Sequence, residues 1–260
     1  TLSGGALWDN SGTVNLGGAT RVVLAGDGAA TFVNRGSGVI NDTSTNAIPI
    51  TVGAATRTGK GFMNAGRFTK ALGSADVQTL DVPMTNTGTI EVLVGTLIAN
   101  GFPANSGIVD LRSGATFSTA GLPLTNSLFG LLKGDGTLVL GGATFTNNGT
   151  VAPGASPGTL TIDGNYVQGP GGTLAVELGG SVPGTDYDLL KVSGSAALDG
   201  TLVVTRSPGT TITEGSAYEF MTYASATGDF SGYGVPQGFA FQTARGPTAY
   251  TLTNSVAAPP

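Results

Sequence analysis

Residues 145–204 decide the fold, and they read FTNNGTVAPGASPGTLTIDGNYVQGPGGTLAVELGGSVPGTDYDLLKVSGSAALDGTLVV. Short runs of β-branched and aromatic residues are separated here by Gly, Pro, Asn and Asp at nearly regular intervals. Such punctuation is typical of short strands that follow one another through tight turns. The stretch therefore predicts an all-β chain with many short strands.

Three segments of this stretch resemble a known family. They are residues 148–160 (NGTVAPGASPGTL), residues 163–166 (DGNY) and residues 186–194 (DYDLLKVSG). They resemble the C-terminal passenger region of bacterial autotransporters and of related secreted β-helix adhesins. The resemblance implies a β-helix fold and a location that is secreted or on the bacterial cell surface, and it implies no particular chemistry.

An internal repeat runs through the rest of the chain. It consists of Asn-x-Gly triplets that begin at Asn10, Asn34, Asn64, Asn86, Asn105 and Asn147, with a related position at Asn126, where Leu128 replaces the glycine. Asn and Gly tolerate positive φ, and an Asn side chain can bond its own backbone two residues on. Each triplet therefore predicts a turn between two apolar runs.

The period of the repeat restricts the architecture. Helical repeats need long segments of 3.6-residue periodicity, which Gly or Pro interrupts here, and propeller blades are about 40–50 residues long. The remaining choice is a right-handed parallel β-helix, a β-solenoid whose coils stack about 4.8 Å apart. We expect coils of about 21–24 residues over residues 1–150, with residues 43–47, 56–60 and 70–76 as outward loops.

The C-terminal half predicts a continuation and an end. Residues 151–205 keep regular alternation and continue the solenoid in the style of an autotransporter passenger. Residues 206–252 carry many aromatic side chains and predict a C-terminal β cap or docking segment, because a solenoid must cover its last coil. Residues 253–260 are expected to be a tail or linker.

Composition excludes several classes of function. The 260 residues include 44 Gly and neither His nor Cys, so Ser-His-Asp and Cys-His catalysis and His- or Cys-ligated metals are excluded. The net charge of −5 and the scattered 11 Lys and Arg argue against nucleic-acid binding. No apolar run reaches the roughly 18 residues of a membrane helix, so we expect no membrane insertion by this segment.

Carboxylates are the remaining chemical groups. Asp186 and Asp188 are the closest acidic pair, and on a strand they would share one face. A structural role in turn capping, calcium binding and acid–base catalysis are the three alternatives, and the first is preferred. We therefore expect no cofactor and no enzymatic activity, with calcium as the weaker alternative.

These features predict a non-enzymatic extracellular structural protein, a rigid rod that self-associates end to end into filaments or matrix fibres. Two alternatives stay open, namely a monomeric adhesin or passenger rod and a polysaccharide-binding or polysaccharide-cleaving β-helix. The expected partners are other copies of the chain and also host or matrix glycans. The candidate assembly interface consists of Leu2, Leu7 and Trp8 at one end and of Tyr218, Phe220, Tyr223, Phe230, Tyr233, Phe239, Phe241 and Tyr250 at the other.

Overall fold

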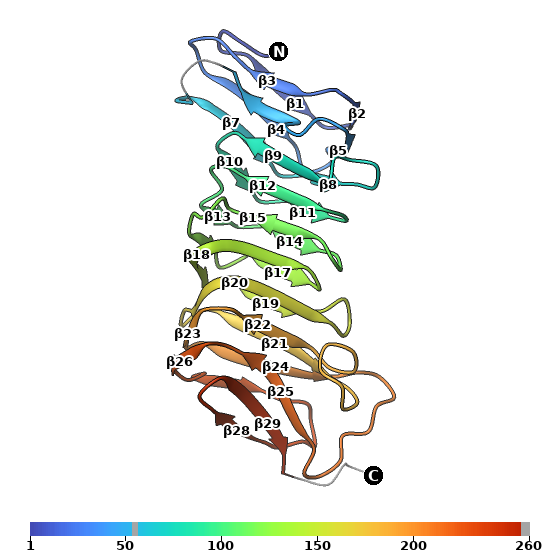
Figure 1. Ribbon diagram of the computed structural model, residues 1–260, viewed down its shortest axis with the longest axis vertical. Coiled ribbons are helices and arrows are strands. Elements are labelled where there is room, and N and C mark those ends of the chain that lie inside the picture. Colours follow the sequence, from blue (N-terminus) through green and yellow to red (C-terminus); the bar gives the residue numbers. More distant parts are fainter. Residues whose placement is uncertain (54–56, 256–260) are drawn as a thin grey trace.

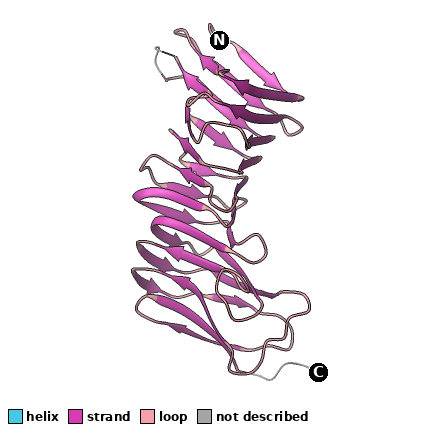
Figure 2. Ribbon diagram, turned by 45° about the vertical axis from the view of Figure 1, so that its right-hand side comes forward, coloured by secondary structure: helices cyan, strands magenta, loops and turns pink. Residues whose placement is uncertain are grey.

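The structure is a computed structural model that describes residues 1–53 and 57–255. The chain forms an elongated stack of strand coils, with the N-terminus at one end and the C-terminal region at the other (Figure 1). Strands and connecting loops make up all the described residues, without a helix (Figure 2). The prediction of an all-β parallel β-helix is confirmed. Correspondingly, the described residues contain no helix that could cross a membrane.

Each coil contributes strands to three faces, and along every face the neighbouring coils pair in parallel. The first face contains β2 (Thr13–Gly18), β5 (Val39–Ser44), β8 (Arg67–Lys70), β11 (Thr89–Val92), β14 (Ile108–Leu111), β17 (Leu131–Gly134), β19 (Thr150–Pro153), β21 (Thr173–Leu178), β24 (Thr201–Arg206) and β27 (Gly232–Gly234). The second face contains β3 (Val22–Leu24), β6 (Ile50–Val52), β9 (Val77–Asp81), β12 (Thr96–Ala99), β15 (Thr116–Ser118), β22 (Leu189–Val192) and β25 (Ala217–Thr222). The third face contains β1 (Leu7–Asn10), β4 (Ala30–Asn34), β7 (Lys60–Asn64), β10 (Met84–Asn86), β13 (Ala104–Asn105), β16 (Leu124–Asn126), β23 (Ser195–Leu198) and β26 (Ser225–Gly228). Two long strands, β18 (Thr137–Asn147) and β20 (Thr159–Gln168), run through both the second and the third face, which therefore merge into one sheet.

The core fills the inside of the coils. Side chains alternate between the two sides of each strand, so β21 buries Leu174, Val176 and Leu178 and leaves the residues between them partly exposed. On the third face the inward position carries stacked aromatic rings, with centroids 4.4 Å apart between Trp8 and Phe32 and 5.2 Å apart between Phe32 and Phe62. Burial of these apolar side chains is the main term that stabilises the rod.

The C-terminal region forms one more coil and then a hairpin. β25, β26 and β27 pair in parallel with the preceding coil. β28 (Phe241–Arg245) and β29 (Ala249–Asn254) form an antiparallel hairpin whose strand β29 pairs with β25. The hairpin thus covers the free edge of the second face. The expected tail begins later than predicted, because Thr253 and Asn254 belong to β29, and its residues 256–260 lie outside the described residues.

Three segments predicted as outward loops lie partly inside the stack. Ser44 ends β5, Lys60 begins β7 and Lys70 ends β8, and all three side chains are buried. Residue 56 lies outside the described residues. The prediction was wrong at these positions because strand alternation turns the side chains inward, although polar residues normally mark loops.

Candidate functional site: the asparagine ladder and the two ends

The seven predicted turn asparagines form one continuous ladder inside the rod. Each is the last residue of its third-face strand, and neighbouring asparagines are register partners. The Nδ2 group of each asparagine donates to the Oδ1 atom of the next at 2.8–2.9 Å, from Asn10 to Asn147. Asn147 then donates to Oε1 of Gln168 at 3.3 Å, so a glutamine continues the ladder. All eight side chains are buried.

Each ladder amide also bonds the backbone of the corner. Asn64, Asn86 and Asn126 donate to carbonyl oxygens of the next coil at 3.0–3.1 Å. The Oδ1 atoms of Asn10, Asn105 and Asn147 accept the N–H of the residue two positions on, as an asparagine turn predicts. The ladder therefore satisfies the polar groups of the corner in two directions, along the coil and between coils.

The backbone reason for the triplets differs from the expected one. None of the seven asparagines has positive φ, and among non-glycine residues in the described ranges only Ala120 and Ser156 do. The triplet glycines also lack positive φ, but Gly66, Gly88, Gly107 and Gly149 lie against the backbone of the preceding coil. A Cβ atom on Gly88 would stand 2.0 Å from the carbonyl oxygen of Gly66, and one on Gly107 would stand 2.2 Å from that of Gly88. These glycines are required for close stacking of the corners, and not for left-handed turns.

The N-terminal end of the described stack has strands with a free edge. β1 pairs only with β4, and β2 pairs only with β5. Leu7 is 59% exposed, and Leu2 and Trp8 are half-buried against the core. These three predicted interface residues therefore remain accessible in part.

At the C-terminal end the hairpin covers the second face, whereas β26 and β27 are each paired on one side, and most of the predicted interface is interior. Tyr218, Phe220, Tyr223, Phe230, Phe239 and Tyr250 are buried. The ring of Tyr250 lies 5.3 Å from the rings of both Phe220 and Phe230, so the hairpin packs on the last coil through these residues. Only Tyr233, which is 45% exposed, and the half-buried Phe241 reach the surface. Of the two alternatives predicted for residues 206–252, the structure agrees with the cap, because most of these aromatic residues form its core and few are accessible to another chain.

The two candidate calcium carboxylates serve different turns. Both precede β22, so they do not share a strand face. Asp186 accepts the N–H groups of Ser181 and Val182 at 2.9 and 3.0 Å. Asp188 is buried and accepts the N–H groups of Gly158 at 3.0 Å and Glu177 at 2.8 Å.

The surroundings of Asp188 determine the pKa of its carboxyl group. Burial raises the pKa of Asp188 to about 6, although the two backbone N–H groups favour its ionised form. Nowhere in the described ranges do three or more acidic side chains form a group that could hold a metal ion. The arrangement of these two aspartates corresponds to turn capping.

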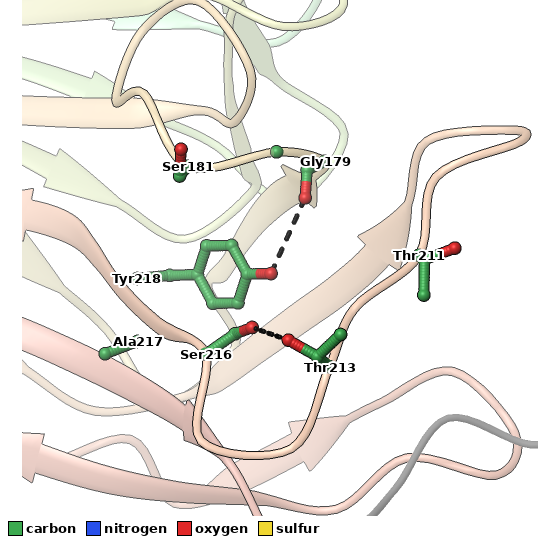
Figure 3. Close-up of a pocket in the computed structure, with 8 residues that line it drawn as sticks. Gly179, Ser181, Thr211, Thr213, Ser216, Ala217 and Tyr218 are labelled. Carbon is green, nitrogen blue, oxygen red and sulfur yellow. Dashed lines mark hydrogen bonds between the residues drawn. The ribbon is translucent and has the colours of Figure 1, made fainter.

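A polar cleft of about 300 Å³ lies beside this region, between residues 179–181 and residues 211–218 (Figure 3). Thr213 and Ser216 share a hydrogen bond of 2.9 Å at its edge, and the Tyr218 hydroxyl faces the carbonyl oxygen of Gly179 at 3.5 Å. The lining residues carry hydroxyl groups and no charged side chain. The cleft therefore lacks the paired carboxylates that glycoside cleavage requires.

The chain was compared with family models and with curated proteins. The chain matches no family model and no curated protein.

Sequence reasoning missed two parts of the interior. Gln168 continues the ladder although no Asn-x-Gly triplet marks it, and the only signal was its position 21 residues after Asn147. Asp42 and Lys70 point into the core from strands β5 and β8. Asp42 follows Asn34 by eight residues and Lys70 follows Asn64 by six, so spacing did not align the two positions, and their charge argued against burial.

Proposed function

We propose that this chain is a non-enzymatic structural rod that acts outside the cell, as a stiff spacer on a bacterial surface. The observation that carries the proposal is the unbroken ladder from Asn10 to Gln168, in which every coil is hydrogen-bonded to the next through buried amides. Such a ladder joins each coil to its neighbour in one register, so bending requires buried hydrogen bonds to break.

The surface location is supported by the resemblance of residues 148–160, 163–166 and 186–194 to autotransporter passengers. A rigid rod suits that location because its length holds one end away from the cell. The ten strands of the first face correspond to a stack of about 45–50 Å at the usual strand spacing.

Three measurements test the proposal. Small-angle X-ray scattering is expected to give the profile of a single elongated particle, and single-molecule pulling between the two ends is expected to give stepwise loss of coils. Protease treatment of intact source cells should degrade the protein. A compact scattering profile would contradict the rod, and protection from protease in intact cells would contradict the surface location.

A second candidate function is end-to-end self-association into filaments. Within the described stack, β1 and β2 at one end and β26 and β27 at the other are paired on one side, and such strand edges favour it because they are templates for another chain. The burial of Tyr218 and Phe220 argues against a head-to-tail contact through these two residues. Light scattering over a concentration series, with negative-stain microscopy, separates the two functions, since fibres of one-rod width would require this second function.

A further inference from the structure

A charged pair lies inside the apolar stack near the N-terminal end. Asp42 of β5 and Lys70 of β8 are register partners on the first face, and both side chains are fully buried. Their neighbours in the same inward row are Leu16 and Val92. Two opposite charges therefore interrupt a row of aliphatic side chains.

The pair does not form a direct salt bridge. No oxygen of Asp42 lies within 4.0 Å of Lys70 Nζ. The ammonium instead donates to Ser74 Oγ at 2.8 Å and to the carbonyl oxygen of Ala75 at 2.6 Å. Asp42 Oδ1 accepts the backbone N–H and the hydroxyl of Ser44 at 2.9 and 2.7 Å.

Gln78 of β9, on the second face, is the third buried polar side chain beside Asp42 and Lys70. Its Nε2 donates to the carbonyl oxygens of Ser44 and Asn46 at 3.1 and 3.2 Å, and the side chain is fully buried. Two buried acceptors remain without a hydrogen bond, Asp42 Oδ2 and Gln78 Oε1. A buried acceptor without a hydrogen bond destabilises the fold, and more so when it is charged.

We propose that Asp42, Lys70 and Gln78 form a binding site for one internal water molecule. The water donates its two protons to Asp42 Oδ2 and Gln78 Oε1, and it accepts the third proton of the Lys70 ammonium. Three partners of this kind match the usual coordination of a buried water, and a bridging molecule accounts for a charged pair held apart beyond hydrogen-bond distance.

Charge selects water over a metal ion. A cation between Asp42 Oδ2 and Gln78 Oε1 would face the ammonium of Lys70, which repels it, and the further carboxylate that acts on this ammonium, Asp76, is exposed to solvent. Water supplies the two donors without any charge. The site thus joins β5, β8 and β9 at the corner between the first and second faces.

A crystal structure at about 1.5 Å resolution, from crystals soaked in rubidium chloride, tests the proposal. We expect one density peak at hydrogen-bond distance from Asp42 Oδ2, Gln78 Oε1 and Lys70 Nζ, with no rubidium anomalous signal. An anomalous peak would show a cation site and overturn the proposal, and so would direct contact between the carboxylate and the ammonium.

The variant Gln78→Leu provides a second test. It removes one acceptor, so we expect the peak to weaken or vanish while Asp42 and Lys70 keep their positions. Leu97, the register partner of Gln78 in β12, already shows that leucine fits this inward row. A peak of unchanged position and strength in the variant would overturn the assignment of Gln78. If this variant fails to fold, the crystal of the unaltered chain still decides the proposal.

Discussion

The ladder amides are the residues on which the stack depends most directly. Asn86 stands in the middle, accepting from Asn64 and donating to Asn105. Asn86→Ala leaves the Nδ2 of Asn64 and the Oδ1 of Asn105 each short of one buried bond. We expect a loss of about 1–3 kcal/mol in the free energy of unfolding, measured by urea denaturation. The exposed neighbour Thr87 provides the control, and equal stability of Asn86→Ala and Thr87→Ala would contradict the role of the ladder.

Glycine at the corner is required for space. Gly88→Ala would place a methyl group against the carbonyl oxygen of Gly66, and the backbone of neither coil can move without breaking ladder bonds. We expect a loss of about 3 kcal/mol or more. Gly12→Ala is the matched control, because nothing lies within 4 Å of that Cβ position. Its effect is expected to stay within about 0.5 kcal/mol. Similar losses in both variants would contradict the role of crowding at Gly88.

The raised pKa of Asp188 makes the free energy of unfolding depend on pH, and the direction of this dependence is known. Folding raises the pKa of this carboxyl group from 3.8 to about 6, so the folded state favours the protonated form. The contribution of the Asp188 carboxyl group to the free energy of unfolding is complete below about pH 4 and is lost as the pH rises through about 6. Relative to Asp188→Asn, the unaltered chain should lose about 3 kcal/mol between pH 4 and pH 7, measured by urea denaturation. A carboxyl pKa near 4 in a carbon-detected NMR titration would refute this expectation.

At the scale of elements, the β28–β29 hairpin covers the last parallel strand of the second face, so that strand cannot pair with a further coil. The hairpin pairs antiparallel with β25, and Tyr250 packs against Phe220 and Phe230. An antiparallel hairpin leaves only β28 as the outer strand of this face, and β28 is short and carries Arg245. Short, charged edge strands are poor templates for further pairing.

Removal of the hairpin should therefore convert the end into an adhesive surface. A chain that stops at residue 236 leaves the edge of β25 unpaired and exposes Phe220 and Phe230. We expect it to form oligomers whose size grows with concentration, measured by light scattering beside the full chain. A truncated chain that stays monomeric and equally stable would show that the hairpin is dispensable as a cap.

At the scale of the whole molecule, each coil contacts mainly its two neighbours, so stability is distributed along a line. Coils in the middle have partners on both sides, whereas β1, β2, β26 and β27 are each paired on one side. Amide hydrogen exchange should therefore be slowest in strands β11 to β20 and fastest in these four end strands. Uniform protection along the rod would indicate that the stack unfolds as a single cooperative unit.

The sequence by itself determined the class of fold and the phase of its repeat. Gly, Pro and Asn at short intervals leave no room for helices, and the positions Asn10 to Asn147 mark the same corner in every coil. This information is local, because turn chemistry and strand alternation act within a few residues.

Tertiary structure alone decided which side chains became interior. Stacking converted seven turn asparagines into a buried ladder, and it turned Asp42 and Lys70 toward the core and most of the C-terminal aromatic residues into the interior of a cap. These outcomes depend on contacts between residues 19 to 34 positions apart. The coil lengths vary, so sequence spacing could not align these partners, whereas backbone pairing between coils brings them into register.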